Sequence, residues 1–348
     1  MIEKVLMKGN EAIAEAAVRA GCGAYFGYPI TPQNELIAYM AKAMIDRGRV
    51  FIQAESETAA INMVYGASAA GARAMTSSSS PGISLKQEGI SYAAGADIPV
   101  VVVNMVRGGP GLGCIAPAQS DYFQATRGGG HGDYRCIVLA PKSVQECADL
   151  TVLAFDLSDK YRMPAILLGD GMIGQMMEGL ELPPERTAPV REWAVGNMKN
   201  RPSRHLTSIN LVPEELEAQT RTRFVRYEAV KANEIRYEYI GDPNPDLTIV
   251  AYGTSARVSY GAIRLAQAEA LKVGLFRPIT LWPFPANQLA RIAESGKPLL
   301  TVEMSMGQLV EDVKLAVLAK APVHFLGHNG GVIPTEEEVL EEIRNIVR

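Results

Sequence analysis

Polar residues of four kinds follow apolar stretches in the first third of the chain. Thr31 lies in "YPITP", Glu57 in "QAESE", a row of serines in "TSSSSPG", and Arg107 directly after "IPVVVVNMV". A guanidinium and a hydroxyl can bind an anionic ligand, and a carboxyl group can exchange a proton with a bound molecule. These residue types could together bind a small ligand and act on it.

The threonine of this set lies in a stiff loop. Pro29 and Pro32 fix their own φ angles at about −65° and push the preceding residues, Tyr28 and Thr31, towards extended backbone. A loop stiffened on both sides would hold the Thr31 hydroxyl in place as a donor to a ligand. The alternative is a turn in which this hydroxyl bonds its own backbone.

Glu57 and Arg107 each have a structural explanation beside the functional one. Glu57 would lie in the first turn of a helix, where the dipole favours an acid, and Arg107 could form a surface ion pair. Glu55 competes with Glu57 because it precedes it by two residues. All of these groups follow successive strands, and parallel sheets bind ligands beyond the carboxyl ends of their strands. We therefore expect one shared crevice.

The elements that must position these residues alternate between strand and helix. Strands are expected at 23–30, 49–54, 73–76, 98–106, 135–141 and 164–170, and helices at 7–20, 33–47, 56–71, 86–95 and 143–161. This alternation, with its runs of Val and Ile, predicts a doubly wound α/β domain with a parallel sheet. The small residues of helix 56–71 predict close backbone packing that leaves Glu57 partly desolvated.

The pattern changes after the last of these strands and resumes at Asp246. Residues 181–245 are rich in proline and charge, and their helix has a thin apolar stripe, so we expect a connecting arm that contributes no core. Beyond it, strands are expected at 247–253, 272–279, 298–304 and 323–327, with helices beginning at 255, 286, 310 and 335. The sequence thus predicts two doubly wound α/β domains, 1–180 and 246–348.

Composition argues against several classes of protein. The chain of 348 residues is 47% hydrophobic and has a net charge of −4, so it lacks the basic field typical of nucleic-acid-binding proteins. No apolar run is long enough to span a bilayer, and acidic residues stand where a signal peptide would be apolar. We expect a cytoplasmic protein with neither nucleic acid nor membrane as a partner.

Metal ligands do not cluster in the sequence. The four cysteines form no C-x-x-C pair, and the four histidines lack ligand spacing. The "GDG" at 169–171 with Asn197 resembles a magnesium-binding signature, but a proline-rich connector separates them where that signature needs a helix and a strand. We expect no metal site within this chain.

The glycines of "RGGPGLG", which begins at Arg107, invite a dinucleotide-binding interpretation. That interpretation fails because Pro110 lacks an N–H donor and the spacing is not G-x-G-x-x-G after a first strand. A flexible loop that lets backbone approach a ligand is the better interpretation.

Together these motifs resemble one enzyme family. "YPITP", a glutamate nine residues before the glycine of "YGA", a serine-proline-glycine turn and an arginine after a buried strand resemble the α subunit of the thiamine-diphosphate-dependent 2-oxoacid:ferredoxin oxidoreductases. The stretch "GGHGDYRCIVLAPKSVQECADLTVLAFDLSDKYRMPAILLGDG" is most similar to the branched-chain (2-oxoisovalerate) branch, and the 2-oxoglutarate branch is close. The resemblance implies a pyrimidine-binding-like domain over 1–180 and a transketolase C-terminal-like domain over 246–348.

The resemblance also implies roles for individual residues. Glu57 matches the catalytic glutamate, whose carboxyl group bonds the pyrimidine ring of thiamine diphosphate and helps that ring to deprotonate the thiazolium. Ser79, Pro81 and Gly82 match the cofactor-binding turn. Arg107 and Thr31 are expected to bind substrate: the guanidinium would take the carboxylate of a 2-oxoacid bidentately and the hydroxyl would donate to it.

A multi-subunit enzyme is implied as well. A β subunit would carry the diphosphate and magnesium, so that thiamine diphosphate is shared, and iron-sulfur clusters would lie there or on γ and ferredoxin-like subunits. The expected reaction is the CoA-dependent oxidative decarboxylation of a 2-oxoacid to an acyl-CoA with reduction of ferredoxin. Two alternatives stay open: the small subunit of another thiamine-dependent 2-oxoacid dehydrogenase, and a non-catalytic binding module on the same fold.

Overall fold

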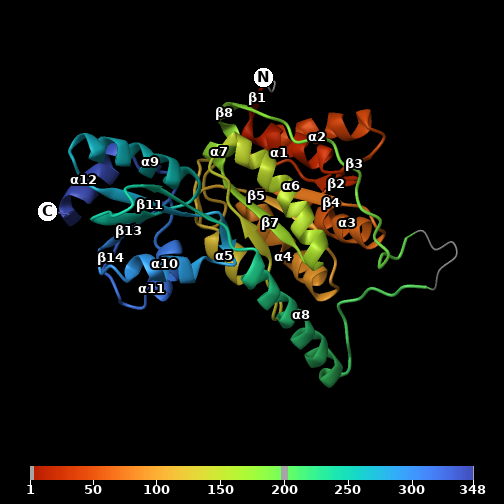
Figure 1. The fold of residues 1–348 in the computed structure, drawn as a ribbon. Coiled ribbons are helices and arrows are strands. Elements are labelled where there is room, and N and C mark those ends of the chain that lie inside the picture. The colour runs from red at the N-terminus through yellow and green to blue at the C-terminus, as the bar shows by residue number, and fades with distance from the viewer. Residues whose placement is uncertain (1–3, 197–202, 348) are drawn as a thin grey trace.

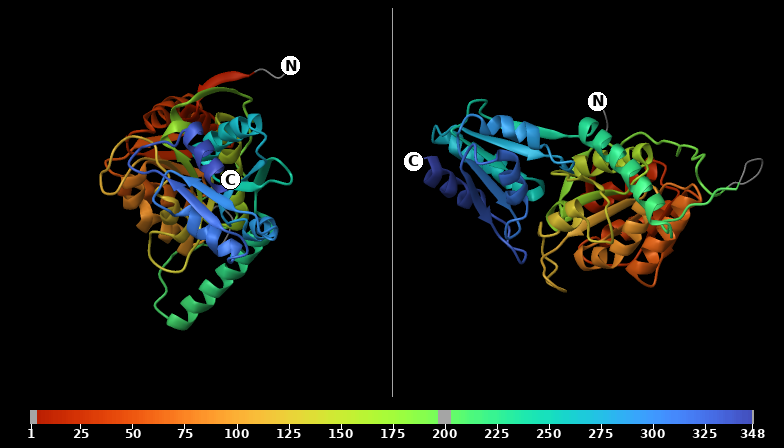
Figure 2. Two further views of the ribbon diagram at one scale, coloured as in Figure 1. Left: turned by 90° about the vertical axis from the view of Figure 1, so that its left-hand side faces the viewer. Right: turned by 90° about the horizontal axis from the view of Figure 1, so that it is seen from below.

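The computed structural model describes residues 4–196 and 203–347, and it has two α/β lobes that lie side by side (Figure 1; Figure 2). Within these residues, an N-terminal lobe is built around a seven-stranded sheet and a C-terminal lobe around a five-stranded sheet. A further pair of strands, β1 (Val5–Lys8) and β8 (Met177–Leu180), is antiparallel. The predicted fold class of two α/β domains is confirmed.

The sheet of the N-terminal lobe is largely parallel. Its strands are, in spatial order, β12 (Thr280–Trp282), β6 (Ile137–Leu139), β7 (Ala165–Asp170), β5 (Val101–Val106), β4 (Ala74–Ser78), β2 (Ala24–Gly27) and β3 (Val50–Gln53). β12 is antiparallel to β6, and the other strands run parallel to one another. The central strand β5 is buried along its whole length, because helices cover both faces of the sheet.

Those helices form two layers (Figure 1). On one face lie α1 (Gly9–Arg19), α2 (Asn34–Asp46) and α6 (Val144–Tyr161), and on the other lie α3 (Glu57–Ala69) and α4 (Ser80–Gly95). The strand order explains the division, because right-handed crossovers place helices on opposite faces when the direction along the sheet reverses. The short helices α5 (Tyr122–Arg127) and α7 (Gly171–Gln175) complete the lobe.

Two helices of this lobe begin elsewhere than the sequence predicts. α4 begins at Ser80, well before the predicted start at Lys86, because Pro81 fits the first turn of a helix and Ser79 has extended backbone at the N-cap. α1 begins at Gly9, because Met7 and Lys8 belong to β1. The serine-rich segment after β4 is therefore the start of a helix and not only a turn.

The C-terminal lobe has a second, smaller sheet. Its strands are, in spatial order, β14 (Val323–Gly327), β13 (Leu299–Glu303), β10 (Leu247–Val250), β11 (Val273–Pro278) and β9 (Tyr237–Gly241), of which β9 alone is antiparallel to its neighbour. α9 (Gly253–Ala268) packs with α12 (Glu336–Val347), and α10 (Ala286–Ala293) packs with α11 (Leu309–Val317). β9 thus falls within the stretch expected to be a connecting arm.

A long helix, α8 (Pro213–Asn233), links the two lobes and projects from the molecule in Figure 1. Most of its surface is exposed, but Tyr227 and Val230 are buried in the core of the N-terminal lobe. The Tyr227 ring meets Trp282 of β12 edge-on, with 5.9 Å between centroids. The expectation that residues 181–245 contribute no core was wrong, because the thin apolar stripe of α8 packs inward. Like the other described helices, α8 is not long and apolar enough to cross a membrane.

The lobes meet along polar contacts that we call the interlobe seam (Arg277, Glu146, Glu238, Asp170 and Thr254). Arg277 of β11 donates to both carboxylate oxygens of Glu146 at 2.7 and 2.9 Å and to Glu238 at 2.8 Å. Asp170 accepts hydrogen bonds from the backbone N–H and the hydroxyl of Thr254 at 2.9 and 2.6 Å. The bonds of Arg277 to Glu146 and of Thr254 to Asp170 hold the C-terminal lobe against the carboxyl ends of the N-terminal strands, whereas Glu238 orients Arg277 from the neighbouring strand of its own sheet.

Candidate functional site

The polar residues singled out in the sequence lie at one edge of the N-terminal sheet. β5, β4, β2 and β3 are neighbours in that order and run parallel, so their carboxyl ends share an edge. Arg107 follows β5, Ser79 follows β4, Thr31 lies in the loop after β2, and Glu57 begins the helix after β3. We call this region the strand-end crevice. The structure thus brings together residues that are 76 positions apart in the chain.

The Thr31 loop is fixed through its backbone. Asn10 and Gln175 donate to the carbonyl oxygen of Pro32 at 2.8 and 2.9 Å, and Arg107 donates to that of Thr31 at 3.0 Å. The Thr31 hydroxyl oxygen accepts from Asn34 at 3.2 Å. A hydroxyl that accepts in this way keeps its own proton available for a ligand. Three side chains, and not the prolines alone, therefore hold the loop.

Arg107 has its guanidinium partly engaged within the chain. The residue is 7% exposed; Nη1 donates to the Thr31 carbonyl, Nη2 donates to the Leu112 carbonyl at 3.1 Å, and buried Nε has no partner among the described residues. Arg107 therefore ties the Thr31 loop to the glycine-rich loop while keeping donors free. Its expected bidentate contact with a substrate carboxylate stays a prediction that would use those remaining donors.

Glu57 is the first residue of α3 and is only 7% exposed, whereas Glu55 is exposed. A Cβ atom on Gly82 would lie 2.6 Å from Oε1 of Glu57 and 2.1 Å from Oγ of Ser78, so glycine is required where α4 approaches this carboxylate. The small residues of α3 were expected to let backbone pack closely against Glu57. A Cβ atom on Gly66 of α3 would meet only open space, so this residue does not contribute; Gly82 of α4 is the glycine that lets backbone approach the Glu57 carboxylate.

A pocket of about 380 Å³ opens beside these residues, between the lobes. Ser80, Pro81 and Asp121 line it from the N-terminal lobe, and Met306 and Gln308 line it from the C-terminal lobe. Burial raises the pKa of Asp121, whose carboxylate accepts from Asn104 at 2.8 Å. Sequence reasoning missed Asp121, because it lies in an irregular segment without a motif.

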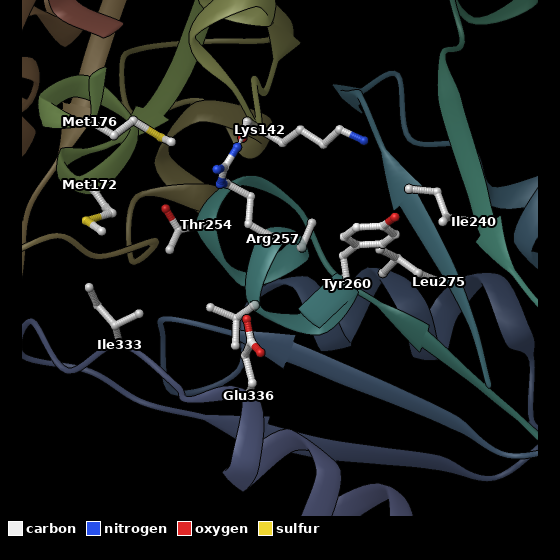
Figure 3. Close-up of a pocket in the computed structure, with 12 residues that line it drawn as sticks. Lys142, Met172, Met176, Ile240, Thr254, Arg257, Tyr260, Leu275, Ile333 and Glu336 are labelled. Atoms are coloured by element: carbon white, nitrogen blue, oxygen red, sulfur yellow. Dashed lines mark hydrogen bonds between the residues drawn. The ribbon is translucent and has the colours of Figure 1, made fainter. Parts of the chain in front are cut away.

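A larger cavity, of about 540 Å³, lies elsewhere between the lobes and contains none of the predicted residues (Figure 3). Met172 and Met176 face it from one side, and Thr254, Arg257 and Tyr260 of α9 face it from the other. Its cations are already paired: Lys142 with Glu238 at 2.5 Å and Arg257 with Glu178 at 2.9 Å. The chemistry of the strand-end crevice is absent here.

The "GDG" segment serves the fold. Asp170 caps α7 by accepting from the N–H of Ile173 at 3.1 Å and accepts from Thr254 across the interlobe seam. Asn197, its expected companion in the magnesium signature, lies outside the described residues. In the part of the chain that the structure describes, no three His, Cys, Asp or Glu side chains are grouped as metal ligands.

The strand-end crevice lies within a region that matches a known protein family. The model described as "Pyruvate flavodoxin/ferredoxin oxidoreductase, thiamine diP-bdg" matches residues 15–239, which include the whole strand-end crevice up to Arg107. The chain belongs to the 2-oxoacid:ferredoxin oxidoreductase family. A second model of this family, "Pyruvate:ferredoxin oxidoreductase core domain II", matches residues 245–339.

Relatives within the family agree with the predicted branch. The ketoisovalerate oxidoreductase subunit VorB of Methanothermobacter marburgensis is 49% identical over 98% of this chain and 97% of its own length. The 2-oxoglutarate synthase subunit KorA of the same organism is 35% identical over 99% of both chains. The resemblance to the branched-chain branch, with the 2-oxoglutarate branch close, is confirmed.

Solved structures support the same assignment. The 2-oxoglutarate:ferredoxin oxidoreductase of Magnetococcus marinus, solved with 2-oxoglutarate, coenzyme A and succinyl-CoA bound, superposes with a TM-score of 0.89 at 27% identity. The match covers 100% of this chain and 66% of that one. A split-gene transketolase superposes with a TM-score of 0.60 at 14% identity over 97% of this chain and 96% of that one, and it shares the fold.

The crevice of this oxidoreductase subunit has the features of a cofactor site. Ser77 is satisfied, since its hydroxyl bonds both Tyr25 and Gln33 at 2.6 Å. Ser78 and Ser79 are equally buried, but their hydroxyls have no partner among the described residues. Buried polar atoms are rarely left without partners unless a ligand or another chain completes them. With the Glu57 carboxylate against Gly82, these residues fit the thiamine diphosphate that the family binds.

Proposed function

We propose that this chain is the α subunit of a 2-oxoacid:ferredoxin oxidoreductase whose substrate is a branched-chain 2-oxoacid, with 2-oxoglutarate as the second candidate. The 49% identity to a ketoisovalerate oxidoreductase subunit, against 35% to a 2-oxoglutarate synthase subunit, supports that order. In the reaction the C1–C2 bond of the 2-oxoacid breaks, carbon dioxide leaves, and the acyl group forms a thioester with CoA. The two electrons released reduce ferredoxin.

One observation carries the assignment of the site: Glu57 is buried against Gly82 beside two unpartnered serine hydroxyls. When bound, thiamine diphosphate supplies the nucleophilic carbon and the electron sink for decarboxylation. Glu57 is the residue that holds and moves a proton at its carboxyl oxygens. Ser79, Pro81 and Gly82 hold the cofactor from the N-terminal end of α4, and Pro81 lines the adjacent pocket.

Arg107 and Thr31 orient the substrate carboxylate in this proposal. The guanidinium keeps donors beyond those that bond two main-chain carbonyls, and the Thr31 hydroxyl, which accepts from the Asn34 side chain, keeps its own proton, so both groups can donate to an anion. Holding the carboxylate in one orientation lowers the entropic cost of releasing carbon dioxide.

Partner subunits supply the remaining groups. We assign the diphosphate and magnesium to a β subunit, and the iron-sulfur clusters to that subunit or to γ and ferredoxin-like subunits. One feature of the chain supports this division: both carboxylate oxygens of Asp170 already accept hydrogen bonds from Thr254 and Ile173.

The decisive experiment compares Glu57→Gln with Glu55→Gln in the assembled complex. Loss of an acid-base group reduces turnover by roughly 10²- to 10⁴-fold, and we expect that loss for Glu57→Gln with assembly intact. Glu55→Gln, at an exposed position, is the matched control and should be mild. Reversed effects would contradict the assignment. Turnover of 2-oxoisovalerate, 2-oxoglutarate and pyruvate by the wild-type complex ranks the substrates.

A further inference from the structure

A fully buried lysine lies next to the proposed catalytic glutamate. Lys86 of α4 has no exposed surface, and its Nζ donates to the main-chain carbonyl of Glu57 at 3.2 Å. Lysines are almost never fully buried unless they are paired, because burying an ammonium is costly. Among the described residues no carboxylate forms a direct ion pair with this ammonium, so its burial calls for another explanation.

The position of Lys86 on α4 gives that explanation. Gly82 and Lys86 are four residues apart, so they lie one above the other on the same face of the helix. Gly82 permits contact with the carboxylate of Glu57, and Lys86 binds the carbonyl oxygen of the same residue. One face of α4 therefore holds Glu57 at both its side chain and its backbone.

The charges of the two residues are coupled. Burial lowers the pKa of Lys86 to about 8, and the negative charge of Glu57 opposes that decrease. Arg107 and Asp121 have their own hydrogen-bond partners, and Glu88, on the same helix as Lys86, is exposed.

We propose that Lys86 is a positioning residue that fixes the Glu57 carbonyl and places a positive charge beside Glu57 from inside the protein. The proposal rests on the proton-transfer role proposed for Glu57. A carboxyl group buried without a countercharge retains its proton, and a retained proton cannot be shared with a bound ring nitrogen. Lys86 supplies the countercharge from inside the protein, where it does not occupy the ligand side of the carboxylate.

The proposed role of Lys86 predicts a change in the pH dependence of processes that require Glu57. Removing a positive charge makes neighbouring protons bind more tightly, so the acid limb of any Glu57-dependent process moves to higher pH without Lys86. Wild-type Lys86 itself loses its charge as the pH rises past about 8. The difference between wild type and a neutral variant is therefore present below that pH and disappears above it.

The test uses Lys86→Gln and Lys86→Met in the assembled complex, with exposed Lys42→Met as the matched control. Gln keeps a donor for the Glu57 carbonyl and removes the charge, whereas Met removes both. The readouts are the dissociation constant of thiamine diphosphate and the rate of proton exchange at its C2, each measured from pH 6 to 9. We expect both variants to shift the acid limb upwards by about 0.5 to 1 pH unit and the Lys42 control to shift nothing.

The outcomes separate this proposal from the one on which it rests. Glu57→Gln is measured in parallel, and normal C2 exchange in that variant would overturn the role of Glu57 itself. Slow exchange in Glu57→Gln together with wild-type pH profiles for both Lys86 variants would overturn the role of Lys86 alone. A loss that is equal at every pH would also overturn it, since that pattern marks a purely structural residue. If Lys86→Met fails to assemble, Lys86→Gln decides.

Discussion

Two buried arginines in this subunit have opposite surroundings. Arg277, in the interlobe seam, is 1% exposed and donates through Nε, Nη1 and Nη2 to the carboxylates of Glu238 and Glu146. Arg107, in the strand-end crevice, is 7% exposed, donates to two main-chain carbonyls, and leaves buried Nε without a partner. Burial is similar, but the set of partners is not.

The difference distinguishes structural from functional burial of charge. In the seam every guanidinium nitrogen finds a carboxylate within the same chain, so the chain needs nothing further there. In the crevice Arg107, Ser78 and Ser79 all carry buried polar atoms without partners. Since such atoms cost free energy, a region that gathers them is one that a ligand or a partner subunit completes.

The largest expected effect on stability comes from breaking the seam. Arg277→Met leaves the partly buried Glu146 without its cation and Glu238 with Lys142 alone, and breaking a buried pair in this way costs about 3–5 kcal/mol of unfolding free energy. Urea denaturation of the complex, followed by tryptophan fluorescence, measures the loss. Arg221→Met, which removes an exposed pair with Glu217, is the control and should cost at most about 0.5 kcal/mol. Equal midpoints for both variants would mean that the seam is not a stabilising contact.

Breaking the crevice should damage kinetics more than stability. Arg107→Ala is expected to lower kcat/KM for the 2-oxoacid, because it leaves a buried substrate carboxylate unpaired. The decrease should correspond to a loss of about 2–5 kcal/mol of transition-state stabilisation. Thr31→Val removes one neutral donor and should cost about 1 kcal/mol. Proton exchange at thiamine C2 should stay near wild type in both variants. Slowed exchange in Arg107→Ala would instead mean that the guanidinium serves the cofactor.

The smallest expected effect comes from two neighbouring serines, one with hydrogen-bond partners and one without. Ser79→Ala removes an unpartnered hydroxyl and should weaken thiamine diphosphate binding by about 0.5–1.5 kcal/mol, with the melting temperature of the apo complex unchanged. Ser77→Ala removes a hydroxyl that bonds Tyr25 and Gln33, so it should lower the melting temperature and leave the affinity alone. Calorimetry gives both quantities. If the two variants behave alike, unpartnered atoms do not identify the cofactor site.

Much of the fold could be predicted because its signals are local. The Val-rich run of β5 and the alternation of strand and helix depend on neighbouring residues, and each predicted residue at the strand ends followed from that alternation. β12 was missed because only Thr280–Trp282 pair with β6 and a proline follows directly. Its strand character comes from its neighbour in space.

Lys86 and Arg277 show the other limit of sequence reasoning. Long charged residues are exposed in most proteins, so neither residue stands out from its sequence context. Their burial depends on Glu57, Glu146 and Glu238, which become neighbours only after the helices and the two lobes have packed. The serines of "TSSSSPG" were noticeable in the sequence, but only contacts distinguish satisfied Ser77 from unpartnered Ser79.

The pairing of β12 with β6 also governs how the chain is made. β6 is complete once Leu139 has been synthesised. Its outer neighbour, β12, begins only at Thr280, which follows α8 and the first strands of the C-terminal lobe in the sequence. Until then the growing polypeptide displays a bare strand edge, of the kind to which other chains add. Because Thr280–Trp282 form the outermost strand of this sheet, the N-terminal lobe gains its complete sheet only after part of the C-terminal lobe has been synthesised.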